Sequence, residues 1–304
     1  MVDSHPADGG APLGGVPMHA ICGHLLRRAQ QVHTAIWTES FGTDLTSPQY
    51  AVLTALAAHP RIDQHRLGQL VSLDKSSVAD VVARLTDRAW IVREGDPQDA
   101  RRNVLTLAPG VGATLDRLTS IAQSVQDRLL EIVPMAQRPH LVSGLRQIAS
   151  LDPRNWAAFV VSPISTLRSD APGALLRRAQ QMHTALWTET FGQTITGPQF
   201  AAVQTLAQYP GISQRNLGER AALDKSTAAD IIARLARRGW IARENDPLDR
   251  RLRLLTLTTT GKQTAESTFT PVMQVQERLL EPVPAPERER FLEALAVLAY
   301  SRNT

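Results

Sequence analysis

The stretch Leu25-Leu26-Arg27-Arg28-Ala29-Gln30-Gln31 returns later in the chain as Leu175-Leu176-Arg177-Arg178-Ala179-Gln180-Gln181. The same offset of 150 residues relates Trp90 to Trp240, so no net insertion or deletion separates the two copies. A repeat of this length is a whole domain, because the repeats of solenoid proteins are several times shorter. The chain is therefore a tandem duplication, and each half is expected to do what the other does.

Composition limits the classes of protein that fit. The 304 residues are 43% hydrophobic and 20% charged, which gives each half enough apolar material for a core of its own. The net charge of +4 and the sequence pI near 9.7 permit an anionic partner. With Cys22 as the single cysteine, no signal peptide and no apolar run of 18 residues, we expect a cytoplasmic protein without internal disulfides or membrane contact.

The offset also predicts the domain boundaries. Residues 1–17, rich in Gly and Pro, have no counterpart before the second copy and are expected to be a disordered tail. The two domains are expected at 18–150 and 173–304. The segment 151–172 has no counterpart within the repeat and is interpreted as the linker of the fusion.

Helix signals follow one another in each copy. Apolar residues three and four apart predict a helix from about His19 to Phe41, and Thr46-Ser47-Pro48-Gln49 is a capping box that starts the next one. A short helix is expected from Gln64 to Val71, followed by a tight connection. Asp74 then caps a longer helix that reaches Arg88. A short helix, a tight turn and a longer helix are typical of a helix-turn-helix.

A strand hairpin is expected after the longer helix. Trp90 to Glu94 and Asn103 to Leu107 flank a polar, Arg-bearing tip, the pattern of a wing. Residues two apart on an extended tip point the same way, so Asp99 is expected to brace Arg101, and Asp249 to brace Arg251 in the second copy. A braced arginine suits a narrow minor groove; the alternative is a surface ion pair of little consequence.

One face of the longer helix is small and polar. If Val78, Val82, Leu85 and Ala89 form its buried stripe, the opposite face can enter a major groove, where hydroxyls bond base edges or phosphates and methyl groups meet thymine. The alternative is an ordinary solvated face. The residues predicted to contact DNA are Lys75, Ser76, Ser77, Ala79, Asp80, Ala83, Arg84, Arg101 and Arg102 in the first copy, and Lys225, Ser226, Thr227, Ala229, Asp230, Ala233, Arg234, Arg250 and Arg251 in the second.

These motifs together resemble the MarR (multiple-antibiotic-resistance regulator) family of winged helix-turn-helix transcription factors. The resemblance covers both halves and is carried by Leu45-Thr46-Ser47-Pro48-Gln49-Tyr50, Asp74-Lys75-Ser76-Ser77 and the Asp-Pro-x-Asp-x-Arg wing followed by Leu-Thr-Leu. It implies a homodimer held by terminal helices that binds a palindromic operator. It also implies release from DNA when a small molecule, often aromatic and acidic, binds near the first helix.

Two departures from the family pattern stand out. The wing's Asp-Arg-Arg is kept at Asp249-Arg250-Arg251, whereas Ala100 takes the middle position in the first copy. More importantly, the family's dimer is fused into one polypeptide. We therefore predict a mainly α fold with small β-wings (α+β), in which two tandem domains form an intramolecular pseudo-twofold dimer. The chain is expected to be a monomer that binds a near-palindromic duplex.

An effector site is expected near the first helix. His33 and Trp37, with copies His183 and Trp187, lie four residues apart and place a titratable donor beside an aromatic wall. Arg28 and Arg178 are predicted to supply charge for a carboxylate. The alternative is a packed tryptophan with a satisfied histidine.

The function expected is that of a transcriptional repressor released by a ligand, and the sequence leaves two alternatives. Cys22 near the start of the first helix would suit a redox-sensing regulator, although its copy is Pro172 and the chain has no resolving cysteine. An architectural DNA-binding protein without an effector is the other alternative. The sequence has no metal-ligand spacing, phosphate loop or nucleophile motif, so we predict no enzyme activity, catalytic residue, metal or cofactor.

Overall fold

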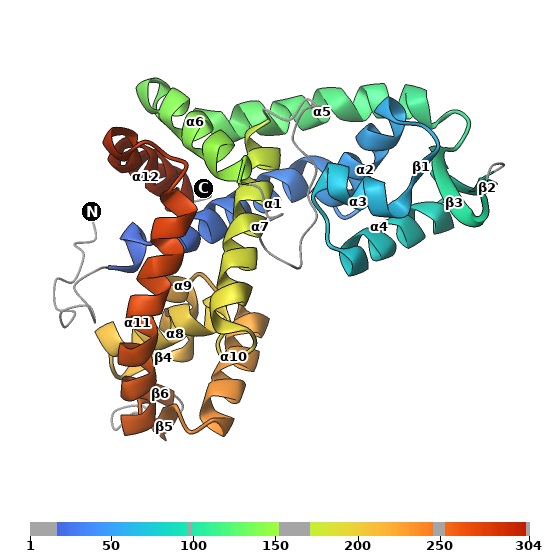
Figure 1. Cartoon of the computed structure of the whole chain (residues 1–304). Helices are drawn as coiled ribbons and strands as arrows, with labels where there is room; N and C mark the ends of the chain where they lie inside the picture. The colour runs from blue at the N-terminus through green and yellow to red at the C-terminus, as the bar shows by residue number, and fades with distance from the viewer. Residues whose placement is uncertain (1–16, 97–98, 152–170, 246–252, 302–304) are drawn as a thin grey trace. The chain divides into compact units, whose positions relative to one another are not determined.

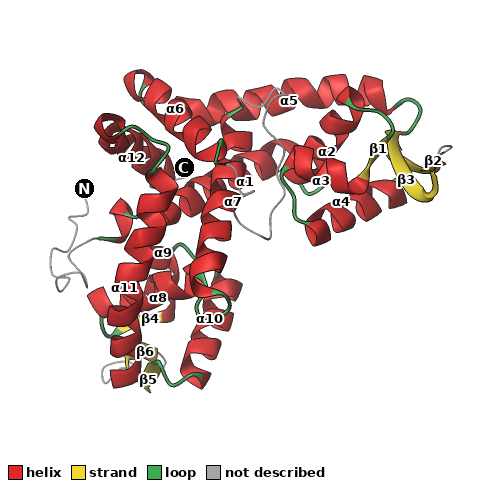
Figure 2. Cartoon of the chain, in the orientation of Figure 1, coloured by secondary structure: helices red, strands yellow, loops and turns green. Residues whose placement is uncertain are grey.

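The computed structural model describes residues 17–96, 99–151, 171–245 and 253–301. Within these ranges the chain is helical with two small antiparallel sheets, as Figures 1 and 2 show, which confirms the predicted fold class. The expected tail and linker lie almost entirely outside the described residues.

The α-helices follow the same order in both repeats. The first contains α1 (Cys22–Phe41), α2 (Ser47–Ala58), α3 (Gln64–Val71), α4 (Lys75–Asp87), α5 (Val111–Glu131) and α6 (Arg138–Ala149), together with the short 3₁₀ helices η2 (Met18–Ala20) and η3 (Met135–Gln137). The second contains α7 (Pro172–Phe191), α8 (Gly197–Gln208), α9 (Gln214–Ala221), α10 (Lys225–Arg237), α11 (Thr259–Leu280) and α12 (Ala285–Ala299). The first long helix begins later than predicted, because Ile21 is extended and separates η2 from α1.

Each repeat carries one three-stranded sheet. In the first, β3 (Asp99–Leu107) lies between β1 (Ile62–Asp63) and β2 (Ile91–Asp96), and the hairpin register pairs Ile91 with Leu107. The second sheet repeats this order with β4 (Ile212–Ser213), β6 (Arg253–Leu257) and β5 (Ile241–Asn245). The hairpins confirm the predicted wings, whereas the short strands β1 and β4 were not predicted.

The chain packs as two compact units that do not coincide with the two repeats. One unit, called unit A, consists of residues 29–182 and 282–304 and holds the first winged helix. The other, unit B, consists of residues 1–28 and 183–281 and holds the second. The beginnings of α1 and α7 therefore each belong to the unit that holds the other repeat's winged helix, and α12 belongs with α6 in unit A.

In unit B, residues at η2 and at the start of α1 pack with the second winged helix. Met18 packs against a core that includes Val203, Leu217 and Ile232. The backbone N–H of Gly23 donates to Oε1 of Gln276 on α11 at 2.8 Å. A Cβ on Gly23 would collide with the His183 ring, so only glycine permits this approach.

Unit A repeats this contact with the roles of the copies exchanged. The Gly173 N–H donates to Oε1 of Gln126 on α5 at 2.8 Å. The His33 ring lies where a Cβ on Gly173 would be. At the far end of this unit, α6 and α12 approach closely because Gly144 leaves room for the fully buried Phe291.

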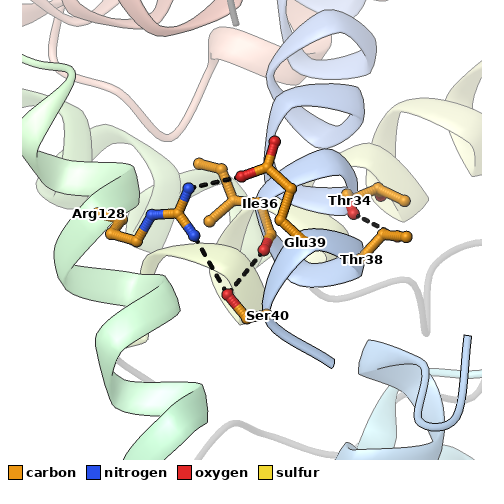
Figure 3. A network of polar contacts seen from close by, with 6 residues as sticks. All are labelled: Thr34, Ile36, Thr38, Glu39, Ser40 and Arg128. Carbon is orange, nitrogen blue, oxygen red and sulfur yellow. Dashed lines mark hydrogen bonds and ion pairs between the residues drawn. The ribbon is translucent and has the colours of Figure 1, made fainter. Parts of the chain in front are cut away.

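The later part of α1 is tied to α5 by surface contacts, shown in Figure 3. Arg128 binds the Glu39 carboxylate at 2.6 Å and the Ser40 hydroxyl at 3.2 Å. In unit B, Arg278 binds Glu189 in the same way at 3.0 Å. Because these pairs are about half exposed, they orient the helices and contribute little stability.

Burial keeps both histidines that lie against these glycines, His33 and His183, neutral. Burial and, to a smaller extent, the positive charge of Arg177 lower the pKa of His33 to about 4. The pKa of His183 is likewise lowered to about 4 by burial, with Arg27 as the nearby charge. Protonation of either ring would place a second positive charge in a dry contact.

We expect the free energy of unfolding to fall as pH falls from about 6.5 to about 4, because over this range the histidines bind protons in the unfolded chain but not in the folded one. Each of these shifts corresponds to about 3 kcal/mol. Urea unfolding at a series of pH values measures the effect. His33→Gln should reduce the pH dependence, and His65→Gln, at an exposed position of α3, should not. An equal slope in the His33→Gln variant would contradict this account.

Candidate nucleic-acid interface and effector region

The helix-turn-helix of the first repeat is assembled from local signals. Asp63 accepts from the Arg66 N–H at 2.8 Å and starts α3, which ends at Ser72 in the left-handed conformation with φ 53°. Asp74 then accepts the backbone N–H groups of Ser76 and Ser77, both at 2.9 Å, and starts α4. The second repeat uses Ser213, Ala222 and Asp224 for the same steps.

The two hydroxyls at the start of α4 are already engaged. Ser76 and Ser77 each donate to the Asp74 carboxylate at 2.5 Å. Burial raises the pKa of Asp74, but the hydrogen bonds from these serines outweigh it and hold the pKa at about 2. The cap therefore stays ionised, and the hydroxyls retain only acceptor capacity. The sequence allowed these hydroxyls to bond either base edges or phosphates. A phosphate oxygen needs a hydrogen-bond donor, whereas a base amino group needs an acceptor, so base amino groups are the partners that remain.

The exposed face of α4 agrees with the helical wheel except at its end. Val78, Val82 and Leu85 are buried, as predicted. Ala89 is exposed and lies beyond the helix with φ 56°, so its placement in the buried stripe was wrong. The chain leaves the helical path after Arg88, and the 3.6-residue period no longer applies there. The residues predicted to face a DNA groove are exposed or half-buried: Ser76, Ala79, Asp80 and Ala83, with Ser226, Ala229, Asp230 and Ala233 in α10.

The helices α4 and α10, which are the predicted recognition helices of the two helix-turn-helix motifs, differ in charge. In α10, Arg234 pairs with Asp230 at 2.9 Å. Within the described ranges, no such pair joins Arg84 and Asp80 in α4. Arg237 is exposed where α4 has Asp87. The second copy is therefore the more basic at this end.

A stacked arginine connects each recognition helix to its wing. Arg88 lies 4.8 Å from the Trp90 ring centroid and donates to the carbonyl of Asp44. Arg238 repeats this over Trp240 at 4.6 Å and donates to Thr194 O at 2.6 Å. Sequence reasoning missed these arginines, although the duplicated Arg-x-Trp spacing is a usable signal.

The wing tips carry residues whose role stays a prediction. Asp99, Arg101 and Arg102 belong to β3, whose register pairs Asp99 with Asp96, and the bracing of Arg101 by Asp99 is not tested. Asp249, Arg250 and Arg251 lie outside the described residues.

The aromatic residues of the effector region are packed. In unit A, Trp37 stacks on Phe41 at 4.4 Å between centroids, has Tyr50 at 5.5 Å and His33 at 5.8 Å, and donates to Leu45 O at 2.6 Å. In unit B, Trp187 lies near His183 and Phe200 and donates to Ile195 O at 2.7 Å. Both tryptophans are therefore packed core residues whose indole N–H groups are satisfied.

The predicted arginines hold backbone groups. Arg178 is buried and donates to Ala149 O at 2.5 Å and to the Ser72 hydroxyl at 2.8 Å. Arg28 donates to Glu219 O at 3.4 Å. The sequence does not show which of two adjacent arginines will bind a backbone carbonyl, because both carry the same charge.

The residue beside Arg178 has a different environment. Arg177 donates to the hydroxyl of Ser47, the first residue of α2, at 3.0 Å, and burial lowers the pKa of Arg177 to about 10. Its Nε and the Nε2 of His33 are buried and have no hydrogen-bond partner among the described residues. Arg177 was not among the predicted site residues, although its positive charge contributes to the lowered pKa of His33.

Cys22 lacks the features of a redox sensor. The thiol is 1% exposed, and burial raises its pKa to about 12. Because the thiolate is the form that peroxide oxidises, this environment disfavours the redox alternative.

In the described part of the chain, no helix is long and apolar enough to cross a membrane.

Comparisons with known proteins agree with this geometry. Models described as the MarR family match residues 43–102 and 195–252, one in each repeat. The transcriptional regulator HosA of Escherichia coli O111:H- is 36% identical over 118 residues, which are 39% of this chain and 87% of HosA. The HTH-type transcriptional repressor NicR of Pseudomonas putida is 30% identical over 145 residues, which are 47% of this chain and 92% of NicR.

A solved structure was also matched. The PcaV transcriptional regulator from Streptomyces coelicolor is 38% identical, with a TM-score of 0.38, over 40% of this chain and 90% of PcaV. Each of these proteins corresponds to less than half of this chain. With one family match in each repeat and relatives covered over most of their length, the chain belongs to the MarR family, as a tandem of two winged helix-turn-helix repeats.

Proposed function

We propose that this chain is a sequence-specific regulator of transcription in which one polypeptide supplies both readers of a near-palindromic DNA site. The observation that carries the proposal is the exchange of segments: each compact unit contains one winged helix together with the helix start of the other repeat. An exchange of this kind ties the two readers together as a dimer would. The relatives HosA, a transcriptional regulator, and NicR, a transcriptional repressor, support the regulatory class.

The exposed faces of α4 and α10 support DNA reading. Their small side chains allow a helix to enter the major groove, and the engaged hydroxyls of Ser76 and Ser226 favour base amino groups as partners. The four groove-facing positions are identical in the two helices, so the half-sites should be similar. For two-fold readers, half-sites lie about 10 bp apart, which implies a duplex site of about twice that length.

The more basic second copy should bind its half-site more tightly. Arg251→Ala should therefore weaken binding more than Arg101→Ala does, and each should reduce the slope of log affinity against log salt concentration by about one. Fluorescence anisotropy at several salt concentrations measures both quantities, with a duplex that the full chain selects from a random pool. Equal losses from the two substitutions would contradict the asymmetry.

The same experiment tests the proposed function. A regulator should prefer its selected duplex to a scrambled one by about a thousandfold or more. Similar affinities for the two duplexes would favour the alternative of an architectural DNA-binding protein.

We further propose that a small aromatic anion binds in unit A and releases the DNA. Arg177 supports this because its buried Nε has no hydrogen-bond partner among the described residues, and its charge acts on the neutral His33, whose ring lies 5.8 Å from the Trp37 ring. The first turn of α2 adds a positive end of a helix dipole. In unit B, the equivalent Arg27 donates to two carbonyls, which favours one effector per chain.

Arg177→Gln should weaken the binding of an aromatic carboxylate by about tenfold or more, because it removes the buried charge. Calorimetry with benzoate measures this, and benzamide is the uncharged control. The matched variant Arg27→Gln should leave both affinity and stoichiometry unchanged. Two equal benzoate sites in the original chain, or equal effects of the two substitutions, would contradict a single effector site in unit A.

A further inference from the structure

The duplicated motif Leu-Leu-Arg-Arg-Ala-Gln-Gln makes different contacts in its two copies. Residues 25–31 and 175–181 have the same sequence, and each copy lies at the start of a long helix. Residues 25–28 and residues 175–181 are each packed in the unit that holds the other repeat's winged helix. The contacts of their arginines can therefore be compared directly.

In unit B, Arg27 holds the turn that precedes the second recognition helix. Its Nη2 donates to Ala221 O at 2.6 Å and its Nη1 to Ala222 O at 2.5 Å. Ala221 ends α9, and Ala222 is its left-handed C-cap with φ 52°. A guanidinium at the carbonyl end of a helix is favoured by the helix dipole. Only Leu223 and Asp224 separate this contact from α10.

In unit A, the equivalent turn is held by the other arginine of the pair. Arg178 donates to the Ser72 hydroxyl, and Gln181 donates to the Ser72 carbonyl. Arg178 also binds Ala149 O, so it joins the ends of α3 and α6. Leu73 and Asp74 are all that separates Ser72 from α4.

Two substitutions between the repeats explain why the arginines differ. The first winged helix offers a hydroxyl to each arginine, since Arg177 binds Ser47 and Arg178 binds Ser72. The second has Gly197 and Ala222 at these positions, which have no hydroxyl. Arg27 therefore donates to main-chain carbonyls, the acceptors that remain at the end of α9.

We propose that Arg27 and Arg178 are positioning residues that each fix the recognition helix of the other repeat. Arg27, from the first repeat, sets the position of α10 through the end of α9. Arg178, from the second, sets the position of α4 through Ser72. Each repeat thus supplies the arginine that positions the other repeat's recognition helix. The two arginines are not copies of each other, because the copy of Arg27 is Arg177. Its relevance to DNA reading rests on the proposed function, but the contacts themselves do not.

Hydrogen exchange of the full chain without DNA tests this. Arg27→Gln should speed amide exchange in residues 214–237 by about tenfold or more and leave residues 64–87 unchanged, because charged hydrogen bonds at a helix end are lost only there. Arg178→Gln should give the reverse pattern. A merely structural role would lower protection in both segments. That result, or an effect confined to each arginine's own repeat, would overturn the proposal.

Milder variants keep the test valid if a glutamine variant unfolds. Ser72→Ala copies the residue that the second repeat already has at the same left-handed position, so it should fold. It should speed exchange in residues 64–87 alone. Arg27→Lys keeps a donor near the end of α9 and should restore part of the protection in residues 214–237. No change from Ser72→Ala and no rescue by Arg27→Lys would also overturn the proposal.

The DNA measurement separates this inference from the proposed function. If the crosswise exchange pattern is found and no duplex is preferred, the positioning role stands and the regulator proposal fails. If a duplex is preferred and the exchange pattern is absent, the reverse holds. When both hold, Arg27→Gln should weaken protection of the half-site bound by α10 in a hydroxyl-radical footprint, and Arg178→Gln that of the half-site bound by α4.

Discussion

The contact between an imidazole and a glycine at the start of each long helix is the constraint on which the rest of the structure depends. His183 lies against Gly23 and His33 against Gly173, at distances that leave no room for a Cβ. Each glycine also donates its N–H to a buried glutamine, Gln276 or Gln126. These contacts place the start of each long helix in the unit that holds the other repeat's winged helix. Each compact unit therefore needs residues from both repeats.

Much of the fold could be predicted from local signals. The capping box at Thr46, the Asp caps at Asp63 and Asp74, and the strand hairpins all depend on residues close in sequence, and the structure has them where expected. Ala89 was misplaced because a helical period does not show where the chain turns into a left-handed residue. The strand β1 has only two residues and exists because β3 offers it an edge, which no local pattern indicates.

The site was less predictable, because its chemistry depends on partners far apart in the sequence. The exposed face of α4 follows from its period, but the engagement of Ser76 with Asp74 fixes what its hydroxyl can bind. Adjacent arginines such as Arg177 and Arg178 are equivalent in sequence and become different only when α7 packs against Ser47 and Ser72. The residues proposed to read DNA are thus the same in both repeats, whereas the changes from Ser47 to Gly197 and from Ser72 to Ala222 alter the contacts that position each recognition helix.

The central claim is that one chain supplies both recognition helices of a single DNA site. Size-exclusion chromatography with light scattering, on the free chain and on its complex with the selected duplex, tests it most directly. The account predicts one chain in solution and one chain on each duplex, at every concentration above the dissociation constant. Two chains on each duplex would contradict it, because each chain would then contribute only one reader.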